Sequence, residues 1–246
     1  MNTDDFDAVL FDLDGVLTPT ADVHMMAWQK MFSEYLAARG IDEPYTESDY
    51  FDHIDGKPRY DGVRSFLASR DITLPEGDSD DPADAETVCG LGNRKNDVFA
   101  AVLETDGVTP YPGSVAFLDQ LQASGTKVAV VSSSRNATAV LAAAGLADRF
   151  EVVVDGVVAA AEHLAGKPSP QTFLFAAEKL GVSADRAVVV EDALSGVAAG
   201  HAGDFGLVIG VDRGVGADRL LQSGADVVVA DLAELVDADA AESVTE

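Results

Sequence analysis

Residues 6–15 read Phe6-Asp7-Ala8-Val9-Leu10-Phe11-Asp12-Leu13-Asp14-Gly15, and the apolar run that ends at Asp12 decides the fold. Short runs of the same kind follow further along the chain. They are rich in valine, lack clean polar alternation, and occupy Lys127–Ser132, Ala187–Asp192, Phe205–Val211 and Ala225–Ala230. This pattern is typical of strands that are buried on both faces of a parallel sheet.

Helical patterns separate these runs. They lie at Ser114–Ser124, Ala137–Ala144, Pro170–Leu180 and Ser195–Ala202. Gly125, Gly145 and Gly181 follow three of them, at the position where a helix C-terminus favours glycine. The alternation of strands and helices predicts an α/β fold with a doubly wound parallel sheet.

One long segment interrupts this alternation. Between about Thr20 and Asp106 there is no convincing buried strand, and helical patterns occur instead at Val23–Arg39, Asp61–Ser69 and Asn93–Glu104. An acidic, turn-rich stretch lies at 75–84. We predict that residues 20–106 form a helical domain, named here the helical insert, between residues 1–19 and 107–246 of an α/β core domain. The acidic stretch is expected to be a solvated loop and the Asp/Ala-rich tail 231–246 a frayed terminus.

The composition limits the partners. The 246 residues include 43 acidic and 16 basic side chains, a formal net charge of −27, and the sequence pI is about 4.1. Such a surface repels nucleic acid and anionic lipid, so neither is an expected partner. A salt-rich habitat remains an open explanation of the acidity.

Cysteine content and hydropathy indicate the compartment. The single cysteine, Cys89, cannot form an intramolecular disulfide, which is typical of a reducing environment. Met1-Asn2-Thr3-Asp4-Asp5 lacks the basic start of a secretion signal, and no apolar run approaches the length of a membrane span. We expect a cytoplasmic protein, monomeric, although an oligomer is not excluded.

Several reactive side chains come at or just after the predicted strand ends, where open parallel sheets bind their ligands. Acids that converge there would repel one another, and Mg²⁺ with oxygen ligands resolves such a conflict. A lysine adds positive charge for an anionic substrate, so the set indicates phosphoryl transfer. The strand-end residues are Asp12, Asp14, Ser132, Glu191 and Asp192, and the lysine is Lys167, in the stretch Gly166-Lys167-Pro168 between the last two of these strand ends.

These motifs, in this order, resemble the four motifs of the haloacid dehalogenase superfamily. The resemblance implies that Asp12 is the nucleophile that forms an aspartyl-phosphate and that Asp14 is the general acid/base. It implies that Ser132 and Lys167 hold the phosphoryl group. It also implies a Mg²⁺ site formed by Asp12, the backbone carbonyl of Asp14, Glu191 and Asp192.

The match extends into the helical insert, which is similar to the cap of β-phosphoglucomutase-like members. Thr20-Ala21-Asp22-Val23-His24 resembles their linker and first cap helix, and it implies that Thr20 and His24 assist catalysis. Asp55-Gly56-Lys57-Pro58-Arg59 resembles the loop that brings an arginine, here Arg59, to the outer phosphate of the substrate. Further substrate contacts are implied for Lys95, Asn96, Ser134, Arg135 and Asn136. Pro19 departs from the family pattern, which often has aspartate there.

The activity that this resemblance implies is that of a β-phosphoglucomutase. Such an enzyme converts β-glucose 1-phosphate to glucose 6-phosphate through an aspartyl-phosphate and glucose 1,6-bisphosphate. One alternative is a Mg²⁺-dependent sugar-phosphate phosphatase, which needs no cations for a second phosphate. Another is a non-catalytic receiver-like regulator phosphorylated on aspartate, but such a protein has no use for a large helical insert. The preferred sugar phosphate is left open.

Overall fold

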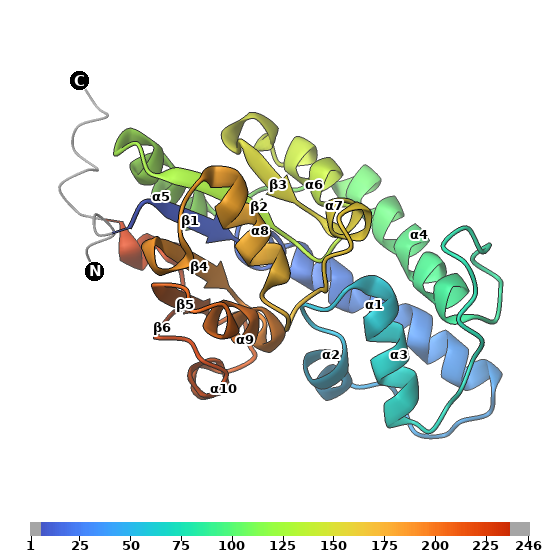
Figure 1. Ribbon diagram of the computed structural model, residues 1–246. Coiled ribbons are helices and arrows are strands. Elements are labelled where there is room, and N and C mark those ends of the chain that lie inside the picture. Colours follow the sequence, from blue (N-terminus) through green and yellow to red (C-terminus); the bar gives the residue numbers. More distant parts are fainter. Residues whose placement is uncertain (1–5, 237–246) are drawn as a thin grey trace.

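The computed structural model describes residues 6–236, and its centre is a six-stranded sheet (Figure 1). The strand order is β3-β2-β1-β4-β5-β6, and every neighbouring pair is parallel. The strands are β1 (Ala8–Phe11), β2 (Lys127–Val131), β3 (Val152–Val154), β4 (Ala187–Glu191), β5 (Leu207–Val211) and β6 (Val227–Val229). The predicted doubly wound α/β fold is confirmed.

Both faces of the sheet are buried, as the unbroken apolar runs predicted. On β1, Val9 and Phe11 belong to one hydrophobic cluster, and Leu10 belongs to a second cluster on the opposite face. The first cluster includes residues of α5 (Pro112–Ala123) and α6 (Ala137–Ala143), and the second includes residues of α8 (Gln171–Leu180) and α9 (Leu194–Ala202). Alternate strand side chains thus anchor helix layers on the two sides.

The sequence patterns missed four short elements. They are β3, α2 (Glu47–His53), α7 (Gly156–Ala161) and α10 (Ala217–Gln222). None exceeds seven residues, so none is long enough to show a clear period. A 3₁₀ helix at Leu232–Leu235 also forms where a frayed tail was predicted, and residues 237–246 of that tail lie outside the described residues.

The helical insert has a hydrophobic cluster of its own. The insert consists of the helices α1 (Thr20–Ala38), α2, α3 (Arg59–Ser69) and α4 (Val88–Asp106). Trp28, Phe32 and Phe66 are buried in that cluster, whose other members also come from the insert. The acidic stretch at 75–84 contains no regular helix or strand, as predicted. The exact domain boundaries remain a prediction.

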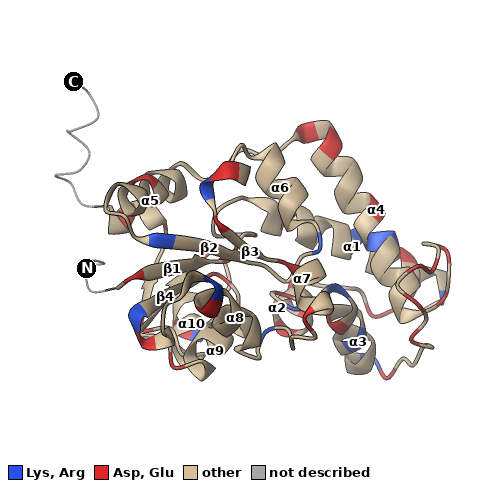
Figure 2. Ribbon diagram, turned by 45° about the horizontal axis from the view of Figure 1, so that its top comes forward, with Lys and Arg blue, Asp and Glu red and all other residues tan. Residues whose placement is uncertain are grey.

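The charge distribution matches the composition. Acidic residues occur on the helical insert and on the core helices and loops (Figure 2).

Among residues 6–236, no helix is both long enough and apolar enough to span a membrane.

Candidate active site

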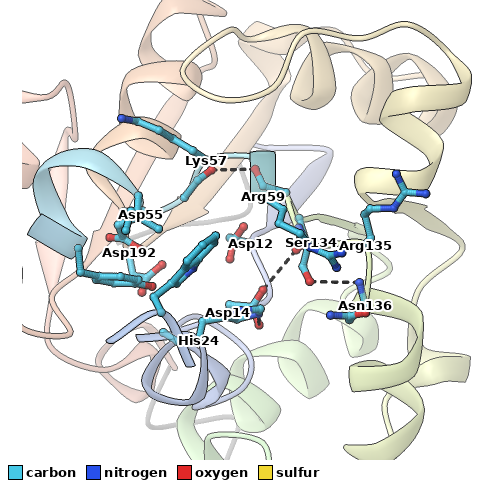
Figure 3. Close-up of a pocket in the computed structure, with 18 of the residues that line it drawn as sticks. Asp12, Asp14, His24, Asp55, Lys57, Arg59, Ser134, Arg135, Asn136 and Asp192 are labelled. Atoms are coloured by element: carbon cyan, nitrogen blue, oxygen red, sulfur yellow. Dashed lines mark hydrogen bonds and ion pairs between the residues drawn. The ribbon is translucent and has the colours of Figure 1, made fainter. Parts of the chain in front are cut away.

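The ends of the central strands bring the predicted core motifs together. Phe11 of β1 is paired with Val130 of β2 and Val190 of β4, so the three strands end at about the same level. Asp12 and Ser132 follow directly after β1 and β2. Together with residues of the insert, these strand-end side chains line one cavity of about 70 Å³ (Figure 3). Its lining from the core includes Asp12, Asp14, Ser132, Glu191 and Asp192.

Lys167 supplies positive charge beside Asp12 and Glu191, two of the acids that line this cavity. Its Nζ lies 2.5 Å from Asp12 Oδ1 and 2.6 Å from Glu191 Oε1, and it donates to the Val131 carbonyl at 2.9 Å. The residue is buried, and its peptide bond to Pro168 is cis. Burial alone would lower the pKa of Lys167, but the charges of Asp12 and Glu191 raise it overall. Lys167 is therefore a permanent cation beside Asp12.

Asp12 has a raised pKa because it is buried among other acids. Burial raises its pKa well above the ordinary value; Glu191 and Asp14 add to this effect, and Lys167 opposes it. Lys167 occupies Oδ1 of Asp12, and among residues 6–236 no donor is hydrogen-bonded to Oδ2. One oxygen is thus held in place while the other remains accessible as a nucleophile.

Asp192 and Asp12 are carboxylates of the kind that bind a divalent cation. Burial raises the pKa of Asp192 well above its ordinary value, and Asp55 and Glu191 raise it further. A Cβ at Gly15, whose φ is +87°, would lie 1.8 Å from Asp192 Oδ2, so only glycine allows this close approach. Mg²⁺ is usually held by one or two carboxylates together with phosphate and water. Asp12 and Asp192 fit that requirement.

Glu191 has a different setting from the other predicted ligands. Its Oε1 accepts from Lys167 and its Oε2 accepts from the backbone N–H of Ala193 at 2.9 Å. Within residues 6–236, no three His, Cys, Asp or Glu side chains are grouped as a complete metal site. The ligand roles of Glu191 and Asp14 remain predictions.

Asp14 is held by groups from the insert. The hydroxyl of Thr20 donates to its Oδ1, Ser132 Oγ lies 3.4 Å from Oδ2, and His24 Nε2 lies 3.4 Å from Oδ1. The last distance is that of a loose polar contact, because His24 Nε2 has no well-formed hydrogen bond. Burial raises the pKa of Asp14, but His24, Thr20 and Lys95 outweigh it and lower the pKa overall.

Lys95 lines the cavity from the insert and contacts His24. Its Nζ meets His24 Nδ1 and lies 5.1 Å from the ring centre of Trp28 and 4.9 Å from that of Phe99. Burial and the neighbouring Arg59 lower the pKa of Lys95 well below its ordinary value. Burial and Lys95 likewise lower the pKa of His24, whose ring lies between Lys95 and Asp14.

Arg59 begins α3 and faces the cavity (Figure 3). Its Nη2 donates to Asn96 Oδ1 at 2.6 Å, and Asn136 Nδ2 donates to the same oxygen at 2.8 Å. The backbone N–H of Asn136 in turn donates to Ser134 Oγ at 3.1 Å. These predicted substrate residues thus form one bridge from insert to core. Arg135 also lines the cavity, although it is exposed and its guanidinium is directed away from Asp12 (Figure 3).

The loop before α3 closes the cavity. Ser133 Oγ donates to the Gly56 carbonyl at 2.7 Å, and Ser195 Oγ donates to the Asp55 carbonyl at 2.9 Å. The sequence patterns assigned no functional role to Ser133, Asp55 or Ser195. The only signal was the position of Asp55 in the loop that presents Arg59. The cavity of about 70 Å³ has room for only a few water molecules in this arrangement of insert and core.

Comparisons with known proteins place the chain in a family. A model of haloacid dehalogenase-like hydrolases matches residues 6–204. A β-phosphoglucomutase of Mycobacterium bovis is 54% identical over 239 residues, which cover 93% of this chain and 91% of that protein. A β-phosphoglucomutase of Bacillus subtilis is 33% identical over 90% of this chain and 92% of its own length.

A crystal structure of β-phosphoglucomutase from Clostridium difficile is similar throughout. The TM-score is 0.76 at 25% identity, and the match covers 96% of each chain. The chain therefore belongs to the haloacid dehalogenase-like hydrolase family, in its β-phosphoglucomutase-like branch.

Proposed function

We propose that this enzyme is a β-phosphoglucomutase that converts β-glucose 1-phosphate to glucose 6-phosphate. The observation that carries the proposal is a second cation, Arg59, in the cavity that Asp12 lines, in addition to the lysine bonded to Asp12. Lys167 is buried and paired with Asp12, whereas Arg59 lines the cavity from the insert. A bisphosphate needs both, whereas a phosphatase of a monophosphate needs only the first. The names of the similar β-phosphoglucomutases agree with this activity.

The first half reaction starts from phosphorylated Asp12. The sugar 6-hydroxyl attacks the phosphorus, and the bond between phosphorus and the Asp12 oxygen breaks. Asp14 accepts the proton of the hydroxyl, and the product is glucose 1,6-bisphosphate. The pKa of Asp14 is lowered, so its carboxylate is ionised and can accept this proton.

The second half reaction runs in the opposite sense on the reoriented bisphosphate. The free oxygen of Asp12 attacks the phosphorus at C1, and the bond from this phosphorus to the sugar oxygen breaks. Asp14 returns its proton to that oxygen, which releases glucose 6-phosphate and restores phosphorylated Asp12. Splitting the transfer into two displacements replaces one difficult step with two easier ones.

Other groups hold these reactants. Lys167 and Ser132 bind the phosphoryl oxygens at the sheet end, and Arg59 with Asn96 binds the outer phosphate. Bound Mg²⁺, held by Asp12 and Asp192, would neutralise charge on the transferring group. β-Phosphoglucomutases of this family generally use Mg²⁺. Closure of the insert excludes water, which would otherwise release the phosphoryl group as free phosphate.

The supporting contacts of Asp14 suit this role. Thr20 donates to its carboxylate, and His24 lies between it and Lys95. We propose that His24 and Lys95 adjust the proton affinity of Asp14 as the second phosphate enters. Lys95 then acts on the substrate from a position beside His24.

The net charge and the free cysteine also bear on the partners and the compartment of the protein. The net charge of −27 supports a small anionic substrate held by local cations rather than nucleic acid or a membrane surface as partner. We propose a cytoplasmic monomer, which accords with the buried, unpaired Cys89.

The test is a comparison of products. The enzyme is incubated with β-glucose 1-phosphate, Mg²⁺ and a trace of glucose 1,6-bisphosphate, and glucose 6-phosphate and free phosphate are assayed in the same sample. We expect glucose 6-phosphate in large excess, with α-glucose 1-phosphate left unconverted and Asp12→Asn inactive. Free phosphate as the main product would assign the enzyme to the sugar-phosphate phosphatases.

A further inference from the structure

The loop between α2 and α3 places one acid of the helical insert against the core. The backbone carbonyl of Asp55 accepts from Ser195 Oγ at 2.9 Å, and that of Gly56 accepts from Ser133 Oγ at 2.7 Å. Gly56 has a φ of +68°, and a Cβ there would lie 2.3 Å from Ser195 Oγ. The loop is therefore fixed from both sides, close to Asp192 at the end of β4.

The side chain of Asp55 lies next to that of Asp192 (Figure 3). Both line the cavity, and Asp55 is the charged neighbour that does most to raise the pKa of Asp192. Burial and the charge of Glu191 raise the pKa of Asp55 itself to about 7. Within residues 6–236, neither Asp55 nor Asp192 forms an ion pair with a basic side chain, because Lys167 is bonded to Asp12 and Glu191.

Two acids from different parts of the chain thus meet without a cation between them. Such an arrangement is costly unless positive charge is supplied at that place. The position is adjacent to Asp12 and Asp192, the two carboxylates that fit Mg²⁺. Because Mg²⁺ retains several water molecules in protein sites, an acid that is too far away to be a direct ligand can accept a hydrogen bond from one of them.

We propose that Asp55 is a carboxylate that the helical insert contributes to the metal site, where it accepts a hydrogen bond from a metal-bound water. This inference rests on the metal site of the proposed function. The ion then links insert to core, and its binding is coupled to closure: it binds more tightly to the closed form and makes that form more populated. When the insert opens, the core retains only its own carboxylates and the ion is held less firmly.

The first test measures metal affinity without any turnover. Binding of Mn²⁺, followed by electron paramagnetic resonance, and of Mg²⁺, followed by calorimetry, is compared between the wild type and Asp55→Asn. Loss of an outer-shell partner weakens metal binding by roughly ten- to a hundredfold. We expect a loss of that size, and unchanged affinity would overturn the proposal.

A matched control separates the metal contact from closure in general. Asp52 lies at the end of α2, and its exposed ion pair with Arg219 of α10 also joins insert to core at 2.6 Å. Asp52→Asn removes the same charge outside the cavity, and we expect it to leave Mn²⁺ affinity unchanged. Equal weakening in Asp52→Asn and Asp55→Asn would show that the effect comes from closure or net charge, and the proposal would be wrong.

A second readout follows the insert itself. Spin labels at Glu34→Cys on α1 and Glu178→Cys on α8, both exposed positions, report the distance between insert and core in a Cys89→Ser background. In the otherwise wild-type protein, we expect Mg²⁺ to narrow the distance distribution toward the closed form. With Asp55→Asn added, Mg²⁺ should have no such effect; a full response there would refute the link.

Two further outcomes keep the result interpretable. The exchange of Asp55 for Asn preserves shape and removes a like charge beside Asp192, so we expect the fold to persist; a melting curve checks this. If that variant does not fold, Ser195→Ala, which frees the same loop, should weaken metal binding in the same direction, and no weakening would count against the proposal. Failure of glucose phosphate isomerisation with an intact metal effect would refute the proposed function alone.

Discussion

Replacing Arg59 with alanine tests whether the insert binds a second phosphate. The guanidinium lies in the cavity and its Nη2 is 2.6 Å from Asn96 Oδ1, so it is already oriented by the insert. A hydrogen bond to a charged group contributes about 1.5–3 kcal/mol, which corresponds to roughly tenfold to a hundredfold in binding. We expect Arg59→Ala to lower kcat/KM for β-glucose 1-phosphate isomerisation by that factor.

The same variant should keep its reaction at Asp12. Hydrolysis of acetyl phosphate uses only the sheet end of the cavity, so its rate should change little. Arg64→Ala is the matched control: Arg64 lies on α3 as well, but its side chain is exposed and paired with Asp61 and Glu76. Both reactions are measured on the same preparations. Equal losses of isomerisation and acetyl phosphate hydrolysis in Arg59→Ala would refute the reasoning and favour a phosphatase.

Lys167→Met should lower the Tm by roughly 6–20 °C, because breaking a buried ion pair costs about 3–5 kcal/mol. Lys30→Met, at an exposed position, is the control. Equal Tm shifts in the two variants would contradict this expectation. Metal-free enzyme should become more stable as the pH falls from above about 7 toward 3.8, because the folded state binds protons at Asp55 and Asp192 that the unfolded state releases. Calorimetric scans across that range test this, and a Tm that falls throughout it would be the opposite result. Gly56→Ala should cost about 1–2 kcal/mol through the positive φ alone, and the clash of its Cβ with Ser195 Oγ adds to this cost. The variant should raise free phosphate relative to glucose 6-phosphate, and an unchanged product ratio would argue against a role in closure.

The core of the site could be predicted because its geometry follows from local sequence. Buried valine-rich strands pair in parallel, and residues directly after adjacent strands must meet at one edge of the sheet. Asp12, Ser132 and Asp192 are placed in this way. The need of several acids for a cation also pointed to Lys167, whose Nζ contacts Asp12 and Glu191.

The contacts between insert and core could not be predicted in the same way. Their partners are far apart in sequence, as Asp55 and Ser195 are, so no local pattern brings them together. The place of Lys95 beside His24 depends on how α1 and α4 pack, which a motif in either helix does not reveal. β3 was missed because three valines carry too little pattern, although they form the edge of the sheet.

The most direct test of the account is to locate the phosphoryl group on the protein. The enzyme is mixed with glucose 1,6-bisphosphate and Mg²⁺, quenched in acid, reduced with borohydride to convert an aspartyl-phosphate to homoserine, and digested for peptide mass analysis. The account predicts conversion at Asp12 alone, and none in Asp12→Asn. A phosphoryl group found on Ser132 or another residue, or an enzyme that isomerises the sugar without becoming phosphorylated, would contradict it.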